Sequence, residues 1–119
     1  LYGTLTLNDI EKLLRDEFPD ATFEFRQTDH EGEMVGFIRE AAESAGGIIN
    51  PGAWTHYSYA LHDALESMSV PKVEVHISNV HAREEWRRRS VVSPAVDAVV
   101  AGMGAFGYVA AAAYLLSRD

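Results

Sequence analysis

Two polar clusters, each directly after a short apolar run, contain the side chains of this chain that are best suited to chemistry. Residues 50–56 (NPGAWTH) follow Ile48-Ile49, and residues 74–79 (EVHISN) follow Pro71-Lys72-Val73. Neither run needs His, Asn or Glu to form a good strand. In an open α/β sheet, ligands bind at the carboxyl ends of adjacent strands. The two clusters therefore predict one site at two neighbouring strand ends.

Glu74 and His76 are the pair in these clusters with the clearest chemical meaning. In a strand over residues 72–77, side chains alternate between faces, so Glu74 and His76 lie on the same face. A central parallel strand is normally apolar on both faces. One interpretation is an edge strand with a wet face. The other is that Glu74 orients or charges His76, which acts as a general acid or base at the strand end.

Asn50, His56 and Asp63 each have an ordinary explanation and a functional one. Asn50 before Pro-Gly is common turn chemistry, yet with His56 it offers an amide and an imidazole from one loop, suited to holding hydroxyls. Asp63 shares a helix face with His56 if the helix reaches back that far; from spacing alone it is a solvated carboxylate. Four arginines would usually form a solvated helix face, but they follow the second cluster, so Arg83 or Arg87 is a candidate partner for an anionic substrate.

Metal and dinucleotide sites are the weaker alternatives. The chain has no His-x-x-x-His pair and no cysteine, which argues against a catalytic metal. Gly102-x-Gly104-x-x-Gly107 matches the dinucleotide fingerprint as a string, but no second βαβ unit follows it. We interpret it as a tight strand-to-helix turn, and we predict neither a cofactor nor a metal.

Size and composition limit the class of protein. The 119 residues fit a single domain, residues 1–119, and 47% apolar residues indicate a globular chain. A net charge of -8 argues against general nucleic-acid binding, which needs a basic surface. The absence of cysteine excludes disulfides and fits a reducing compartment, so we expect a cytoplasmic protein. The uncharged stretch 98–117 is long enough to cross a bilayer, but its glycines favour a buried strand, a turn and a helix.

Helices and strands are expected to alternate along the chain, which implies right-handed βαβ crossovers and a parallel sheet with helices on both faces. Because the pattern begins with a helix, we expect a preceding first strand to be missing, so that the domain is N-terminally incomplete. A Thr6–Asp9 capping box and a Thr28–Glu31 capping box are expected to begin the first two helices. The expected helices are Thr6 to Phe18, a second after Thr28, Tyr57 to Met68 and Phe106 to Ser117; the expected strands are Thr22 to Arg26, Ile48-Ile49, Lys72 to Ile77 and Val96 to Ala101.

The sequence resembles the type II 3-dehydroquinate dehydratases of the shikimate pathway, which leads to chorismate and the aromatic amino acids, and of the quinate pathway. The resemblance covers essentially the whole chain, and the block from Glu74 to Ser90 is highly specific. It implies a flavodoxin-like three-layer sandwich with a parallel sheet of order 2-1-3-4-5, and a dodecamer built as a tetramer of trimers. The matching motifs are Tyr2-Gly3, FRQ at 25–27, HEGE at 30–33, NPG at 50–52, Thr55-His56, Ala60-Leu61 with Asp63-Ala64, residues 74–79 and 81–85, Arg87, Ser90 and residues 102–108.

The resemblance also implies a mechanism: a cofactor-free anti elimination of water from 3-dehydroquinate through an enolate. Tyr2 would be the base, acting as tyrosinate on the C2 proton, and His76 would protonate the departing C1 hydroxyl with support from Glu74. Because tyrosine has a reference pKa of about 10, such a base needs positive charge nearby. In the family an arginine on a lid before the tyrosine supplies it. This chain begins after the lid and after the family's first strand, so these 119 residues alone are expected to be inactive or nearly so.

The resemblance also implies which residues bind the substrate. The Ile77 and Ser78 backbone amides would hold the substrate carboxylate, and Asp63 would reach the site of a neighbouring subunit. A non-catalytic flavodoxin-like module that binds a small carboxylate, or serves assembly, is the competing hypothesis. It does not explain why the chemically active residues of both clusters occur together. The side chains implied to bind substrate hydroxyls are Asn50, His56 and Arg87.

Overall fold

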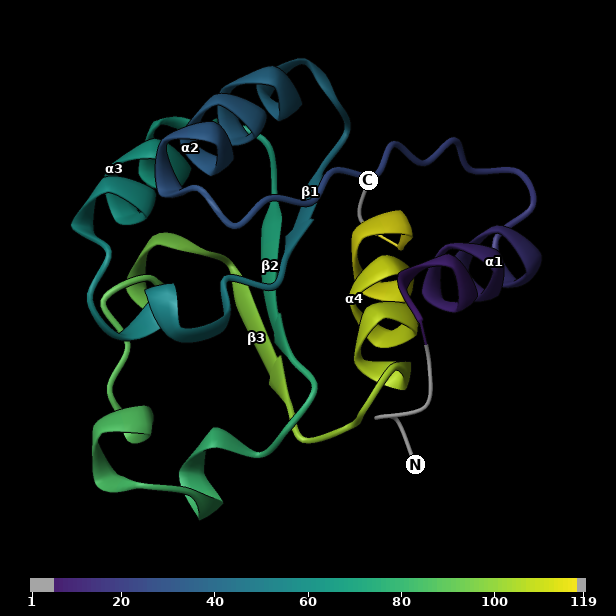
Figure 1. Ribbon diagram of the computed structural model, residues 1–119. Helices are drawn as coiled ribbons and strands as arrows, with labels where there is room; N and C mark the ends of the chain where they lie inside the picture. The colour runs from purple at the N-terminus through teal and green to yellow at the C-terminus, as the bar shows by residue number, and fades with distance from the viewer. Residues whose placement is uncertain (1–5, 118–119) are drawn as a thin grey trace.

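The computed structural model describes residues 6–117, which form a three-stranded parallel sheet covered by helices on both faces (Figure 1). The strand order is β1-β2-β3, so β2 is central. The helices are α1 (Leu7–Glu17), α2 (Glu31–Glu40), α3 (Tyr59–Ser67) and α4 (Phe106–Leu116), and the strands are β1 (Gly47–Ile49), β2 (Lys72–His76) and β3 (Ala98–Ala101). Short 3-10 turns are η2 (Ala41–Glu43), η3 (Gly52–His56), η4 (Val80–Ala82), η5 (Glu85–Arg88) and η6 (Ser93–Ala95).

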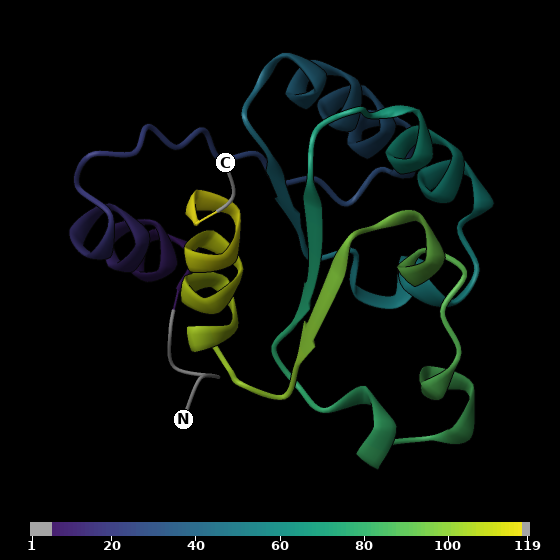
Figure 2. The same ribbon diagram turned by 180° about the vertical axis from the view of Figure 1, so that it is seen from behind.

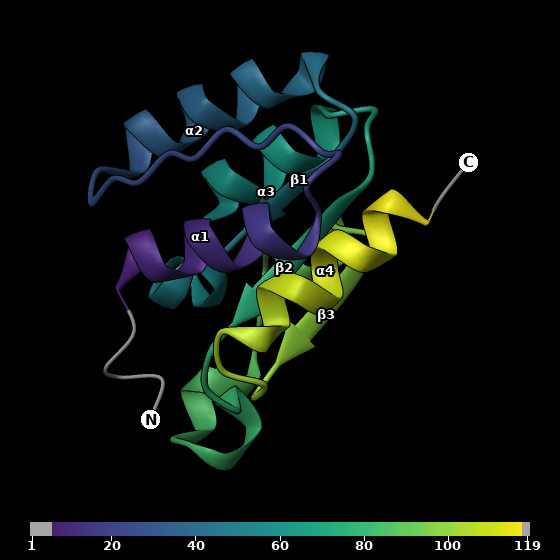
Figure 3. The ribbon, with the colours of Figure 1, turned by 90° about the vertical axis from the view of Figure 1, so that its right-hand side faces the viewer.

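The helices form two outer layers, with α2 and α3 on one face of the sheet and α4, backed by α1, on the other (Figures 1 and 2). Val73 and Val75 of β2 are fully buried against Ala111 of α4. Leu61 and Leu65 of α3 are buried in a separate cluster on the opposite face. The α/β class and the flavodoxin-like layering predicted from the sequence are confirmed. Seen from the side, residues 77–90 loop out beyond the carboxyl ends of β2 and β3 (Figure 3).

The two predicted capping boxes have different outcomes. At α1, Thr6 and Asp9 bond each other's backbone amides, which confirms the first box. The Thr28–Glu31 box is wrong, because α2 begins at Glu31 and no side chain caps it. The Thr28 hydroxyl bonds Glu33 instead, and the Glu31 carboxylate accepts the hydroxyl of Ser58, the residue that caps α3. A local contact with Glu33 has taken Thr28, and a tertiary contact with Ser58 has taken Glu31.

The strand predicted from Thr22 to Arg26 is also wrong. Its side chains do alternate in exposure, and Phe23 and Phe25 pack against a cluster that contains Ile10 and Leu14. A strand also needs a neighbour for its backbone hydrogen bonds. Within residues 6–117, β1 is an edge strand that pairs only with β2, and no further strand lies beyond it.

The uncharged stretch from Ala98 to Ser117 folds as β3, a glycine turn and α4, as predicted. Gly102 and Gly104 adopt left-handed backbone angles, with φ of 85° and 58°. The Gly102 amide donates to the His76 carbonyl at 3.2 Å, and the Gly104 amide donates to the Ile77 carbonyl at 3.0 Å. These two hydrogen bonds hold the turn against the carboxyl end of β2. Among residues 6–117, no helix is long and apolar enough to span a membrane.

Candidate active site

The two polar clusters meet at the carboxyl ends of β1 and β2, around a cavity of about 310 Å³. This confirms the prediction that two adjacent strand ends form one site. Both strands point the same way, so the residues that follow them emerge at the same edge of the sheet. The lining residues are Asn50, Gly52, Ala53, His56, His76, Ile77, Ser78, Val80, Arg83 and Arg87.

Glu74 and His76 form a buried pair on the central strand. The Glu74 side chain is 0% exposed and that of His76 is 7% exposed. Glu74 pairs in register with Ile49 of β1 and Val99 of β3, so β2 has a strand on each side. The edge-strand interpretation is therefore wrong. The imidazole Nε2 lies 2.5 Å from Glu74 Oε2.

Three hydroxyls surround the Glu74 carboxylate. Thr55 donates its hydroxyl hydrogen bond to Oε2, and Ser93 donates to Oε1 at 2.7 Å. The Ser90 hydroxyl lies 2.5 Å from that of Thr55. Burial by itself raises the pKa of Glu74, but the hydrogen bonds from His76, Thr55 and Ser93 and the charge of His76 outweigh it, so the net pKa lies below its ordinary value. Glu74 is a buried carboxylate held in its charged form.

This arrangement decides which ring nitrogen of His76 can meet a ligand. A charged carboxylate only accepts hydrogen bonds, so Nε2 of His76 carries a proton and donates it to Glu74. Nδ1 is the nitrogen left for a molecule in the cavity. It can donate a proton there only when the ring is a doubly protonated imidazolium. Glu74 supplies the opposite charge next to that ring.

Asn50 is held in one orientation from both ends of its amide. Its Nδ2 donates to the hydroxyl of Tyr108 at 3.1 Å, and its Oδ1 accepts the Gly52 amide at 3.1 Å. Tyr108 comes from α4, on the opposite side of the sheet from α3. Burial raises the pKa of the Tyr108 phenol, although the bond from Asn50 works against it, so this hydroxyl stays neutral near pH 7.

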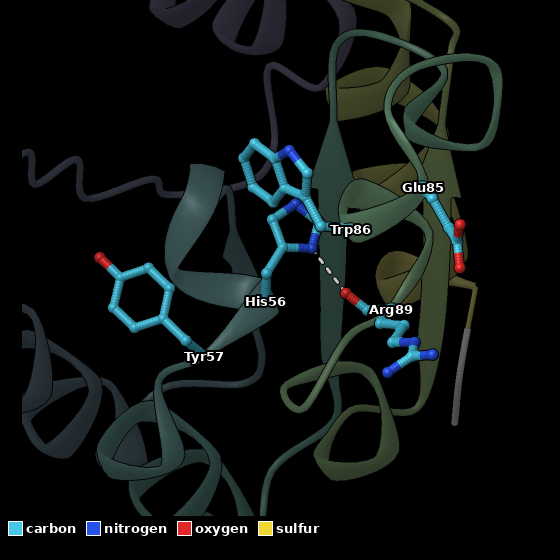
Figure 4. Close-up of a pocket in the computed structure, with 5 residues that line it drawn as sticks. All are labelled: His56, Tyr57, Glu85, Trp86 and Arg89. Atoms are coloured by element: carbon cyan, nitrogen blue, oxygen red, sulfur yellow. Dashed lines mark hydrogen bonds between the residues drawn. The ribbon is translucent and has the colours of Figure 1, made fainter.

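His56 is fixed by the segment that follows β2. Its Nδ1 lies 2.5 Å from the Arg89 carbonyl oxygen, which can only accept, so Nδ1 carries the proton and Nε2 is left for a ligand. Its ring meets the Trp86 ring edge-on, with centroids 5.0 Å apart (Figure 4). His56 also lines a second cavity of about 440 Å³, with Tyr57, Glu85, Trp86 and Arg89. That cavity is larger, but the Glu74–His76 pair does not line it, so the chemistry belongs to the smaller one.

The backbone at the end of β2 presents amides to the cavity. The His76 and Ile77 carbonyls are bound by the glycine turn after β3. In a trans peptide unit the carbonyl and the amide point in opposite directions. The amides of Ile77 and Ser78 therefore point away from that turn, and both residues line the cavity.

Arg87 lines the cavity from η5 and is held by two neighbours. Its Nε donates to Glu84 Oε2 at 2.9 Å, and its guanidinium carbon lies 4.1 Å from the centre of the Trp86 ring. Arg83 lines the same cavity, with an Nη1 to Ser78 Oγ distance of 3.5 Å. Both arginines predicted as partners of an anion thus reach the site.

Asp63 is the predicted site residue that this chain does not bring to the cavity. It is exposed on α3 and lines neither cavity. The helix does not reach back to His56, because α3 begins at Tyr59 and His56 lies in the separate turn η3. Within this chain Asp63 is therefore the exposed carboxylate that spacing alone indicated. Tyr2 lies outside the described residues. Within residues 6–117, no three His, Asp or Glu side chains gather in a way that would hold a metal ion.

Sequence reasoning assigned no role to Tyr108, Thr55, Ser90 or Ser93. Tyr108 lies 58 positions from Asn50, and Ser93 lies 19 positions from Glu74. Hydroxyl residues are common in loops, and no local spacing links them to a distant carboxylate. Only the folded chain could reveal these contacts.

Comparison with known proteins gives a consistent result. The model of the family described as "Dehydroquinase class II" matches residues 1–116. The 3-dehydroquinate dehydratase 1 of Agrobacterium fabrum is 53% identical over 114 residues, which cover 93% of this chain and 79% of that protein. The 3-dehydroquinate dehydratase of Bacillus subtilis is 48% identical over 123 residues, which cover 100% of this chain and 82% of that protein.

A solved structure agrees with the sequence relatives. The type II dehydroquinase from Propionibacterium acnes superimposes with a TM-score of 0.93 at 43% identity, covering 99% of this chain and 83% of that one. On the family model, the curated relatives and this structure together, the chain belongs to the class II dehydroquinases, a family of hydro-lyases.

Proposed function

We propose that the protein converts 3-dehydroquinate to 3-dehydroshikimate by a cofactor-free anti elimination of water through an enolate, with His76 as the general acid. The observation that supports this most directly is the buried Glu74–His76 pair, whose imidazole lines the cavity while the carboxylate lies behind it. The family's activity and this geometry agree. A binding module would not need a charged acid–base pair at the bottom of its pocket.

The elimination divides into two proton transfers. Tyr2, as tyrosinate, takes the proton from C2 of the substrate, and the C2–H electron pair forms the enolate. His76 then gives its Nδ1 proton to the C1 hydroxyl, which leaves as water as the C1–C2 double bond forms. Glu74 stabilises the charged imidazolium before the transfer and orients the ring throughout.

Substrate binding is assigned to groups around the same cavity. The amides of Ile77 and Ser78 hold the substrate carboxylate. Asn50 and His56 hold substrate hydroxyls, because each has one side of its polar group tied to the protein and another left for the substrate. Arg87 completes the set from the loop side.

Asp63 is assigned to the site of a neighbouring subunit, since its exposed position on α3 makes it available to a second chain. This implies a homo-oligomer built from trimers, and we propose a dodecamer. We also propose a cytoplasmic enzyme of the shikimate pathway, which supplies chorismate and the aromatic amino acids, or of quinate breakdown.

The test is a dehydratase assay on the natural full-length protein, following the ultraviolet absorbance of the conjugated enone product. Turnover that survives both a metal chelator and borohydride would support an elimination without metal or Schiff base. His76→Ala should abolish turnover while leaving the fold and the oligomer intact, and Tyr2→Phe should do the same by removing one oxygen. His81→Ala is the matched control, because His81 is exposed and lines neither cavity.

Unchanged turnover in His76→Ala would refute its assignment as the acid. If the wild-type protein binds 3-dehydroquinate but does not turn it over, a carboxylate-binding module becomes the better explanation.

A further inference from the structure

Besides His76, the Glu74 carboxylate accepts hydrogen bonds from the Thr55 and Ser93 hydroxyls, and the Ser90 hydroxyl is bonded to that of Thr55. The hydroxyls of Thr55, Ser90 and Ser93 come from three places: η3, the loop before η6, and η6 itself. None of these residues, nor Glu74, lines the cavity. Whatever they do for a substrate, they must do through His76.

The direction of each hydrogen bond follows from the number of protons available. A hydroxyl has one proton, and the charged Glu74 can only accept, so Thr55 donates to Glu74. Thr55 has then no proton left for Ser90, so Ser90 donates to Thr55. The Ser90 oxygen in turn accepts the amides of Val92 at 3.1 Å and Ser93 at 2.8 Å.

The result is a directed chain that runs from backbone amides through two hydroxyls to Oε2 of Glu74. Ser93 completes it with a separate bond to Oε1. Each donor aligns positive hydrogen with the carboxylate, and hydrogen bonds in such chains strengthen one another. Both carboxylate oxygens are therefore held, and the carboxylate plane is fixed relative to the His76 ring.

We propose that Thr55, Ser90 and Ser93 are positioning residues for the elimination, which hold the charged Glu74 carboxylate in one orientation toward Nε2 of His76. This inference rests on the proposed function of the same site. It assigns to three residues outside the cavity a share in setting the protonation state of the general acid.

Within residues 6–117, His76 is the one charged or titratable side chain that bonds the Glu74 carboxylate. On this face of the sheet, the buried side chains of α3 are Leu61, Ala64 and Leu65. The turns η3 and η6 reach Glu74 through hydroxyls, and His56 of η3 bonds the Arg89 carbonyl instead. The neighbouring strands place Ile49 and Val99 beside Glu74 in register. Within the described residues, the charge that lowers the pKa of Glu74 is that of His76. Burial raises the pKa of Glu74 and the hydroxyl bonds lower it, so loss of one hydroxyl donor would raise this pKa.

The alternative is that the hydroxyls only fasten the loop after β2 to η3. Two other hydrogen bonds already hold that loop against η3: the Val91 amide donates to the Thr55 carbonyl at 2.7 Å, and His56 bonds the Arg89 carbonyl. Neither involves a Thr55, Ser90 or Ser93 hydroxyl. Removing one hydroxyl should therefore leave the loop in place and affect the carboxylate.

The decisive variant is Thr55→Val, which keeps the side-chain shape and removes the hydroxyl that donates to Glu74 and accepts from Ser90. We expect kcat to fall about tenfold, with KM changed less than about twofold, because Thr55 touches no substrate. The acidic limb of the kcat profile should move up by about one pH unit, since Glu74 would then bind its proton more readily. Thr55→Ser restores the hydroxyl and should restore both values.

The matched control is Thr28→Val, which removes another threonine–glutamate hydrogen bond, at the surface and between residues that line neither cavity. It should leave kcat and the pH profile unchanged. An independent readout is the ring ¹⁵N resonance of His76, whose titration in Thr55→Val should be displaced from that of the wild type. This readout needs no turnover.

The outcomes separate the two hypotheses. If the wild type shows no dehydratase activity, the proposed function fails, and the ¹⁵N titration still tests the hydroxyl chain. If the wild type is active and Thr55→Val keeps both its kcat and its pH profile, the inference is overturned. Should Thr55→Val not fold by circular dichroism, Ser93→Ala decides instead, because it removes the donor to the other carboxylate oxygen; the same shift is expected.

Discussion

Replacing Glu74 by glutamine removes a charge from the site while preserving its hydrogen bonds. Oε2 of Glu74 accepts from His76 and Thr55, and Oε1 accepts from Ser93. In Glu74→Gln, the amide oxygen can take the place of Oε2 and keep both donors. The amide nitrogen then faces the Ser93 hydroxyl, which is able to accept. The carboxylate and the amide have nearly the same shape, so we expect the fold to be retained.

The catalytic cost follows from the lost charge. A hydrogen bond to a charged group contributes about 1.5–3 kcal/mol, compared with about 0.5–1.5 kcal/mol for a neutral one. Because the hydrogen bond to His76 is kept and only its charge assistance is lost, the imidazolium would lose about 1–1.5 kcal/mol of stabilisation, and each 1.36 kcal/mol is tenfold in rate. We therefore expect kcat to fall about 5- to 10-fold. KM should change little, because Glu74 is 0% exposed and does not line the cavity.

The assay is steady-state kinetics on the full-length protein, with product formation followed through the enone absorbance. Glu66→Gln is the matched control, because Glu66 also stands beside a histidine, with an Oε2 to His62 Nε2 distance of 3.5 Å, but is exposed. That variant should keep wild-type kinetics. A Glu74→Gln enzyme with kcat within about twofold of wild type would refute the reasoning. So would a loss that appears only as a raised KM.

Three further outcomes are expected. Tyr108→Phe removes the hydroxyl that accepts from Asn50, so KM should rise several-fold at nearly constant kcat, and an unchanged KM would mean that Asn50 does not bind substrate. Gly102→Ala should destabilise the fold by about 1–3 kcal/mol in urea unfolding, because φ is 85° there. Its control is Gly36→Ala, in helix α2 with open space around it, which should stabilise the fold by about 0.5–1 kcal/mol. Equal effects would contradict the argument that the positive φ of Gly102 requires glycine. The folded pKa of Glu74 lies below its ordinary value of 4.5, so the charged carboxylate stabilises the fold above that value. This stabilisation is lost as the pH falls through the folded pKa. The urea midpoint should therefore drop more between about pH 6 and pH 3 in wild type than in Glu74→Gln, and parallel curves would count against a charged Glu74.

The proposed oligomer should cover part of the surface that is exposed in the single chain. Trp86 and Tyr57 are exposed beside the second cavity, at 49% and 58%. Asp63 is exposed on the helix that follows Tyr57. Sedimentation of the full-length protein measures the assembly directly. A monomer would leave Asp63 without the proposed role.

Where the sequence succeeded, the information was local. The alternation of helix and strand depends on apolar periodicity and on glycine and proline, all of which act over a few residues. Two parallel strands bring the residues after them to one edge of the sheet, so the meeting of Asn50 with His76 followed from topology alone. The Glu74–His76 pair was predictable because two positions along a strand share a face.

Where the sequence failed, a distant partner decided the outcome. Thr22 to Arg26 has the alternation of a strand, yet a strand exists only where a neighbour completes its hydrogen bonds, and no local pattern contains that neighbour. In the Thr28–Glu31 box, Glu31 bonds the distant Ser58, and Thr28 then bonds the nearby Glu33. Local preference is a difference of about 1 kcal/mol, which a single tertiary hydrogen bond can reverse.

The sequence by itself determined the family, the layered α/β architecture and the residues that carry the chemistry, since these depend on residue identity and order. Only the tertiary structure decided the state of those residues. It placed the Thr55 hydroxyl on Glu74 across 19 positions and the Tyr108 hydroxyl on Asn50 across 58. Burial removes water, so the charge of Glu74 and the free nitrogen of His76 depend on which polar groups replace that water. Those groups come from segments that meet only when the chain folds.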